Sequence, residues 1–73
     1  MDFRNQIRSY IMREGVTMTS VVELLAQKYG WSRSVSNLSA KLTRGTLKYS
    51  EAVELADVLG YDIIWEKRKE AWL

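Results

Sequence analysis

The residues best suited to chemistry lie between positions 31 and 45, in the stretch WSRSVSNLSAKLTRG. Val35, Leu38 and Leu42 recur there at helical spacing and would line one face of an α-helix. The opposite face carries small, amide-bearing or basic side chains and no carboxylate: Ser36, Asn37, Ala40, Lys41 and Arg44. Such a face suits the major groove of DNA, where amide and cationic side chains pair with base edges. A plain solvated surface is the alternative, because serine and lysine are common on protein surfaces.

Composition excludes most other chemistry. The 73 residues predict a single domain over 1–73, and neither cysteine nor histidine occurs. Disulfides, zinc sites and the common catalytic bases are therefore almost excluded, and we expect no enzyme, catalytic residue, metal or cofactor. The N-terminus has no continuous apolar run, so we expect no signal peptide, no membrane span and a cytoplasmic location. A domain this small buries only about 60% of its unfolded surface, which favours a homodimer.

Charge is unevenly distributed along the chain, although the net value is only +2. The charged residues from Leu24 to Ser50 are all basic: Lys28, Arg33, Lys41, Arg44 and Lys48. Those from Glu51 to Glu66 are all acidic: Glu51, Glu54, Asp57, Asp62 and Glu66. Phosphate attracts the first block and repels the second, so the middle segment is expected to face nucleic acid. Alternatively, the two blocks cancel through salt bridges.

Apolar periodicity predicts four helices, over about 2–14, from 17–20 to 29, at about 33–44, and from near 50 to 59. Glycines at positions 15, 30, 45 and 60 are suited to end them. The expected buried residues are Phe3, Ile7, Tyr10, Ile11, Val21, Val22, Leu25, Ala26, Tyr29, Val35, Leu38, Leu42, Ala52, Leu55, Ala56 and Leu59. Ser50 is expected to cap the last helix, whose acids Glu51, Glu54 and Asp57 face outward. Trp31 is expected to fill the space between the second and third helices.

The segment after Gly60 alternates in character, with Tyr61, Ile63 and Trp65 on one side. Alternation of β-branched and aromatic residues favours a short strand over a fifth helix. A lone strand needs a partner, which the same strand of a second subunit, antiparallel across a two-fold axis, would supply. The expected dimer interface is Tyr61, Ile63, Trp65 and Trp72. Residues 66–73 form a charged tail that is either flexible or packs on the neighbouring subunit.

Four short motifs occur in a familiar order. They are Glu14-Gly15-Val16-Thr17, Val21-Val22 followed by Leu25, Ser34-Val35-Ser36-Asn37-Leu38, and Ala56-Asp57-Val58-Leu59-Gly60-Tyr61. In this order the chain resembles the Cro/repressor-type (XRE) helix-turn-helix superfamily of small bacterial and phage regulators, over roughly residues 3–65. The second helix is about one turn longer than usual, and Met18 replaces the glutamine that often holds a phosphate there. The alignment of the third helix with the base-reading positions of the superfamily is therefore uncertain by one or two residues.

The resemblance implies an all-α bundle of four or five helices that binds duplex DNA as a dimer. Arg33, Ser34, Ser36 and Asn37 would lie nearest the bases. Asn37 could pair with adenine and Lys41 with guanine, whereas Arg44 and Lys48 would hold phosphates. With the hydroxyls at helix starts, the expected DNA-binding residues are Thr19, Ser32, Arg33, Ser34, Ser36, Asn37, Lys41, Arg44 and Lys48.

The implied function is sequence-specific regulation of transcription, by a repressor that occupies a two-fold operator. The sequence does not separate repression from activation. The alternative is a protein-binding module, similar to phage accessory or antitoxin proteins that use the same fold. Its contact surface would be the acidic fourth helix and the Trp65–Trp72 end, since tryptophans are frequent in binding hot spots.

Overall fold

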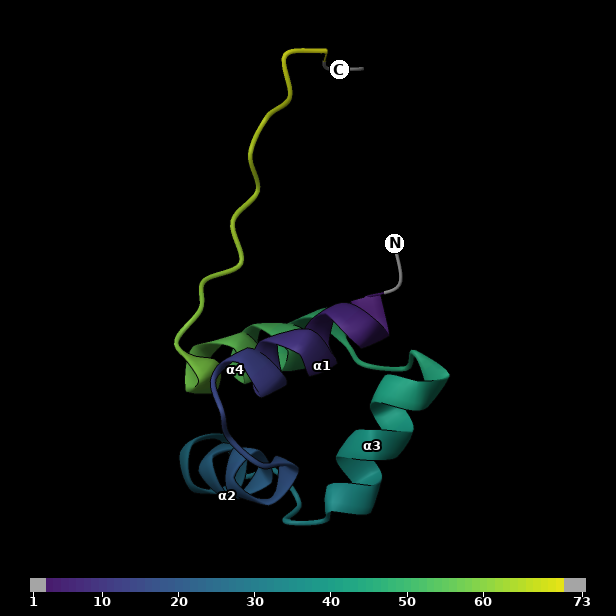
Figure 1. The fold of residues 1–73 in the computed structure, drawn as a ribbon, viewed down its shortest axis with the longest axis vertical. Coiled ribbons are helices and arrows are strands. Elements are labelled where there is room, and N and C mark those ends of the chain that lie inside the picture. Colours follow the sequence, from purple (N-terminus) through teal and green to yellow (C-terminus); the bar gives the residue numbers. More distant parts are fainter. Residues whose placement is uncertain (1–2, 71–73) are drawn as a thin grey trace.

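Four helices make up the secondary structure of residues 3–70, the part that the computed structural model describes, with side chains from residue 5 onward. They are α1 (Phe3–Arg13), α2 (Met18–Tyr29), α3 (Val35–Arg44) and α4 (Tyr49–Leu59). In Figure 1, α1 and α4 lie together above α2, and α3 stands beside them. Residues 3–70 contain no strand, so the domain is all-α, as predicted. Within the same residues no helix is both long and apolar enough to cross a bilayer.

Local side chains set the helix starts. The Thr17 hydroxyl accepts a hydrogen bond from the Ser20 N–H at 3.1 Å and caps α2. The Ser34 hydroxyl accepts one from the Asn37 N–H at 3.3 Å and caps α3. Gly45 ends α3 with φ +69°, a left-handed conformation that glycine adopts without strain. The boundaries of α3 therefore follow from one serine and one glycine.

The start of α4 differs from the prediction. The helix begins at Tyr49, so Ser50 lies inside its first turn and does not cap it. The Glu51 carboxylate instead accepts a hydrogen bond from the Lys48 N–H at 2.9 Å. A carboxylate in the first turn also interacts favourably with the positive end of the helix dipole. Glu51, and not Ser50, therefore provides the side-chain hydrogen bond at the start of α4.

The core draws one face from every helix. The fully buried side chains are Ile11, Val21, Val22, Leu25, Leu38, Leu42 and Leu55, all among the predicted core residues. Trp31 and Val35 are half-buried and pack against this cluster. Trp31 is thus partly buried as expected, but its indole N–H donates to Glu54 of α4, so the side chain faces α4 as well. Tyr29 was predicted as core but is 39% exposed. Its hydroxyl donates to Asp57 at 2.6 Å, and a tyrosine at a helix end keeps that polar tip near water.

The segment after α4 leaves the domain as an extended arm (Figure 1). We call residues 61–70 the arm; it forms neither the predicted strand nor a fifth helix. A strand is defined by hydrogen bonds to a neighbour, and a single chain offers this segment none. Its root is anchored, because Tyr61 packs on Tyr10 with ring centroids 4.8 Å apart and donates its hydroxyl to Glu14 at 2.8 Å. Further along, Trp65 contacts Tyr49 of α4. Trp72, the last predicted interface residue, lies outside the described residues.

Burial predicts that two adjacent leucines of α2 contribute very different amounts to stability. Leu25 is fully buried, whereas Leu24 is 45% exposed. We expect Leu25→Ala to lower the free energy of unfolding by about 2–5 kcal/mol, because it leaves a cavity among α2, α3 and α4. Leu24→Ala is the matched control and should cost less than about 1 kcal/mol. Urea unfolding followed by circular dichroism measures both, and equal losses would contradict this description of the core.

Candidate nucleic-acid interface

The outward face of α3 is set by the two leucines that it buries. Leu38 and Leu42 point into the core, and an open depression outside the helix is lined by Ser36, Ser39, Ala40, Thr43 and Arg44, with the half-buried Val35 at its edge. None of these six is acidic. We call this set the α3 outer face. Its Thr43 hydroxyl accepts a hydrogen bond from the Arg8 guanidinium at 3.0 Å, which places a second arginine, from α1, at its edge.

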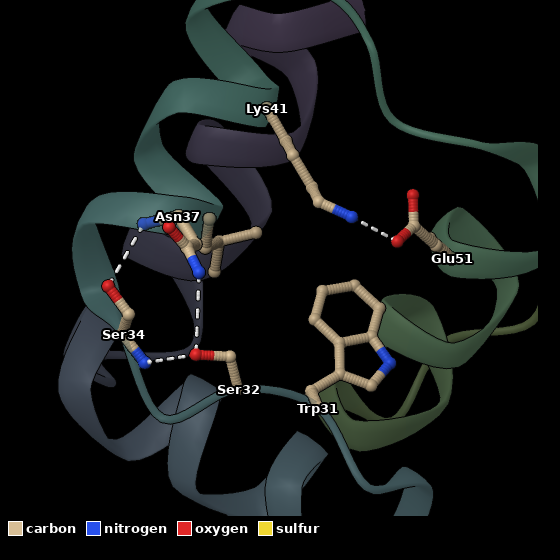
Figure 2. A pocket seen from close by; sticks show the side chains of 7 residues that line it. Trp31, Ser32, Ser34, Asn37, Lys41 and Glu51 are labelled. Atoms are coloured by element: carbon tan, nitrogen blue, oxygen red, sulfur yellow. Dashed lines mark hydrogen bonds and ion pairs between the residues drawn. The ribbon is translucent and has the colours of Figure 1, made fainter.

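A pocket of about 240 Å³ lies on the other flank of α3, toward α4 (Figure 2). Its polar lining comes from Ser32, Ser34, Asn37, Lys41 and Glu51, with Trp31 forming one wall. The Asn37 side-chain amide donates to the Ser32 hydroxyl at 3.4 Å, which also accepts from the Ser34 N–H at 3.2 Å. Asn37 is thus turned toward the linker before α3 and Lys41 toward α4, and both line a different pocket from Ser36 and Thr43. The two flanks of α3 offer different chemistry.

Lys41 and Glu51 join the middle of α3 to the start of α4. The Lys41 ammonium group pairs with the Glu51 carboxylate and lies 5.5 Å from the centre of the Trp31 ring. The hydrogen bond from Lys41, followed by that from the Lys48 N–H, lowers the pKa of Glu51 below its usual value. The Trp31 indole N–H in turn donates to Glu54 at 2.7 Å. The prediction that Glu51 and Glu54 face outward was therefore wrong, because α3 and Trp31 provide cationic and donor partners at that surface.

Two more ion pairs occupy the basic segment. Arg33 bonds Glu23 of α2 at 3.0 Å, with both side chains largely exposed. Lys28 bonds Asp57 of α4 at 2.5 Å, and this contact lowers the pKa of Asp57 and raises that of Lys28. The alternative of cancellation between the two charge blocks thus applies to Lys28 and Lys41, whereas Arg33 pairs with a glutamate that precedes both blocks. In the described part of the chain Arg44 and Lys48 form no ion pair.

The remaining predicted DNA-binding residues are accessible. Thr19 is exposed in the first turn of α2, and Ser32 is exposed in the linker between α2 and α3. Lys48 is exposed just before α4. Arg8 also lies at this surface, although it is not among the predicted DNA-binding residues. Helical spacing places it on the outside of α1, but only the packing of α1 against α3 brings it to Thr43.

Comparison with known proteins yields no match to any protein-family model, any curated protein or any solved structure. Among the described residues, no cluster of acidic, histidine or cysteine side chains could hold a metal ion. The geometry and charge of the α3 outer face and its two flanks are therefore the basis for inferring a function.

The Lys41–Glu51 pair predicts a pH-dependent contribution to stability. The pKa of Glu51 is lower in the folded state, so its contribution is present above the ordinary glutamate pKa of about 4.3 and is lost as pH falls through the lowered value. We expect Glu51→Gln to lower the free energy of unfolding by about 1 kcal/mol at pH 7. The difference between the wild type and the variant should be smaller at pH 3 than at pH 7.

Urea unfolding at both pH values measures this effect, and Glu66→Gln in the exposed arm is the control, with no expected change. An equal loss for Glu51→Gln at pH 3 and pH 7 would show that the charge of Glu51 does not stabilise the fold.

Proposed function

We propose that this protein is a sequence-specific regulator of transcription that binds duplex DNA as a homodimer, with α3 in the major groove. The observation that carries the proposal is the α3 outer face, whose exposed side chains are small, hydroxyl-bearing or basic and include no carboxylate. A surface meant only for solvation has no need to exclude acids, whereas a surface that meets phosphates does.

Dimensions support this placement. The ten residues of α3 give a helix about 15 Å long, and the major groove is about 12 Å wide and admits one α-helix. Ser36 and Ala40, at the middle of the outer face, are small enough to let the backbone approach the bases closely. Arg44 follows on the same face near the C-terminal end of α3, and Arg8 lies at the edge. Both are placed to hold phosphates on either side of the groove.

Base reading falls to residues at the N-terminal part of α3. Asn37 can pair with adenine through its amide once the long hydrogen bond to Ser32 is released. Arg33 can exchange Glu23 for a base or a phosphate at little cost, because an exposed ion pair is worth only about 0–1 kcal/mol. Lys41 needs a larger rearrangement, since Glu51 is half-buried and also bonds the Lys48 N–H. We therefore place Asn37 and Arg33 ahead of Lys41 in base recognition.

The mode of regulation that we propose is repression, in which the dimer covers an operator and excludes polymerase. Selection of bound fragments from random duplex DNA, followed by sequencing, tests whether the protein recognises a specific DNA sequence as a dimer. The proposal predicts an enriched inverted repeat whose half-sites lie about one helical turn, roughly 34 Å, apart. If no sequence is enriched, DNA reading is rejected and the alternative becomes a protein-binding module.

Asn37 tests base recognition. We expect Asn37→Ala to weaken binding to the best selected site by about 1–3 kcal/mol and to relax the preference at one base pair, because the bidentate amide contact is lost. Electrophoretic mobility shifts with the selected site and its single-base variants measure both effects. An unchanged preference would place base recognition elsewhere on α3.

Arg44 tests the phosphate contact. We expect Arg44→Ala to weaken all sites alike and to reduce the slope of log affinity against log salt by about 1 per subunit. Arg13→Ala is the matched control; Arg13 lies over the Tyr10 ring in the last turn of α1, the end away from α3 in Figure 1, and its removal should leave the slope unchanged. Titration by fluorescence anisotropy at several salt concentrations measures the slopes. Equal slopes for wild type and Arg44→Ala would remove Arg44 from the interface.

A further inference from the structure

The arm combines exposed apolar side chains with an unpaired backbone. Ile64 is 78% exposed and Trp65 is 85% exposed. Tyr61 donates its N–H to the Ala56 carbonyl at 2.9 Å, and past that point no backbone hydrogen bond joins the arm to another described residue. An extended segment with free N–H and C=O groups and β-forming side chains is a ready template for pairing with another strand.

The two faces of the arm differ in character. Successive side chains of an extended chain alternate sides, so one face carries Tyr61, Ile63 and Trp65, followed by Lys67 and Lys69. The other face carries Asp62, Ile64, Glu66, Arg68 and Glu70. The arm begins at a groove of about 510 Å³ between α1 and α4, and its first four residues, 61–64, line this groove together with apolar side chains that include Ile7, Leu55 and Leu59. The start of the arm therefore continues an apolar surface of the domain, and the oppositely charged Asp62 and Arg68 share one side of the arm.

We propose that the arm pairs antiparallel with the arm of a second copy of this chain, across a two-fold axis at Trp65. The inference rests on the proposed dimer and says how that dimer forms. In an antiparallel two-stranded ribbon with such an axis, each residue lies opposite a partner residue whose side chain is on the same face of the ribbon. The axis therefore passes between the two copies of one residue. The register then follows from the charges on the Asp62 face.

Three neighbouring registers can be compared. An axis at Ile64 sets Asp62 opposite the partner's Glu66, and an axis at Glu66 sets it opposite the partner's Glu70; both bring like charges together. An axis at Trp65 sets Asp62 opposite the partner's Arg68, and the symmetry gives this ion pair twice. Opposite charges directly across an antiparallel pair stabilise it, and like charges destabilise it. Charge complementarity therefore selects the register centred on Trp65.

The same register suits the proposed reading of DNA. It places Tyr61 opposite the partner's Lys69. The partner's Tyr61 lies eight residues away along the same strand, so the two arm roots lie about 27 Å apart. This is the scale of the roughly 34 Å that separates the reading helices of a two-fold dimer on successive major grooves. In the single chain Trp65 has a contact with Tyr49, whose hydroxyl accepts from the indole N–H at 3.1 Å, and it stays largely exposed. The central pair of tryptophans would bury that surface.

Charge exchange between Asp62 and Arg68 tests the proposal. Sedimentation velocity over a range of concentrations gives the dimer dissociation constant of wild type, Asp62→Arg, Arg68→Asp and the double variant with both changes. Each single variant sets like charges opposite each other twice and should raise the dissociation constant about tenfold or more. The double variant restores both ion pairs with reversed polarity and should return close to wild type. Circular dichroism is expected to be the same for all four, because the arm is outside the core.

A wild type that stays monomeric, or single variants that dimerise as well as wild type, would overturn the arm as the interface. A double variant no better than the single variants would overturn the register. Failure of this inference is distinguishable from failure of the proposed function. A monomer that still enriches one half-site from random DNA would refute arm pairing alone, whereas a dimer that obeys the charge exchange but enriches no sequence would refute DNA reading alone.

Discussion

The burial of Leu38 and Leu42 determines what α3 can present to any partner. Both side chains are almost completely inaccessible, so the rotation of α3 about its own axis is fixed by the core. A rotation by one residue, about 100°, would bring a leucine to the surface and cost about 1.5–3 kcal/mol for each exposed side chain. Ser36, Ala40 and Arg44 therefore face outward as a set. The chemistry of the outer face is a consequence of packing on the inner one.

Ion pairs limit which cations contribute to the field around α3. Lys28, Arg33 and Lys41 each have a carboxylate partner, and these partners come from α2 and α4. The pairs with Asp57 and Glu51 also hold α4 against α2 and α3, so their main role is structural. Arg8 and Arg44 are left at the α3 outer face, with Lys48 beyond the end of α3. In the proposed account, this small number of phosphate contacts per subunit makes dimerisation necessary for tight binding.

The helices and most of the core could be predicted from the sequence because they follow from local rules. The spacing of Leu38 and Leu42 and the left-handed glycines mark α3 without knowledge of its neighbours. Partners between helices could not be predicted: the contacts of Glu51 with Lys41 and of Arg8 with Thr43 depend on how α1, α3 and α4 cross. The arm shows the same limit. Alternation of Tyr61, Ile63 and Trp65 predicts a strand, and this prediction was wrong for the single chain, because local alternation does not supply the hydrogen-bonded neighbour that a strand requires.

The central claim is that the α3 outer face is the surface that meets DNA. Backbone amide chemical shifts, recorded by NMR while a random-sequence duplex is titrated into the protein, test this claim most directly. The account predicts that the perturbed amides cluster on α3 and its linker, at Ser36, Asn37, Ala40 and Arg44, with a smaller effect at Arg8, and that added salt reverses them. Perturbations confined to α2, α4 or the arm, with α3 unaffected, would contradict the claim.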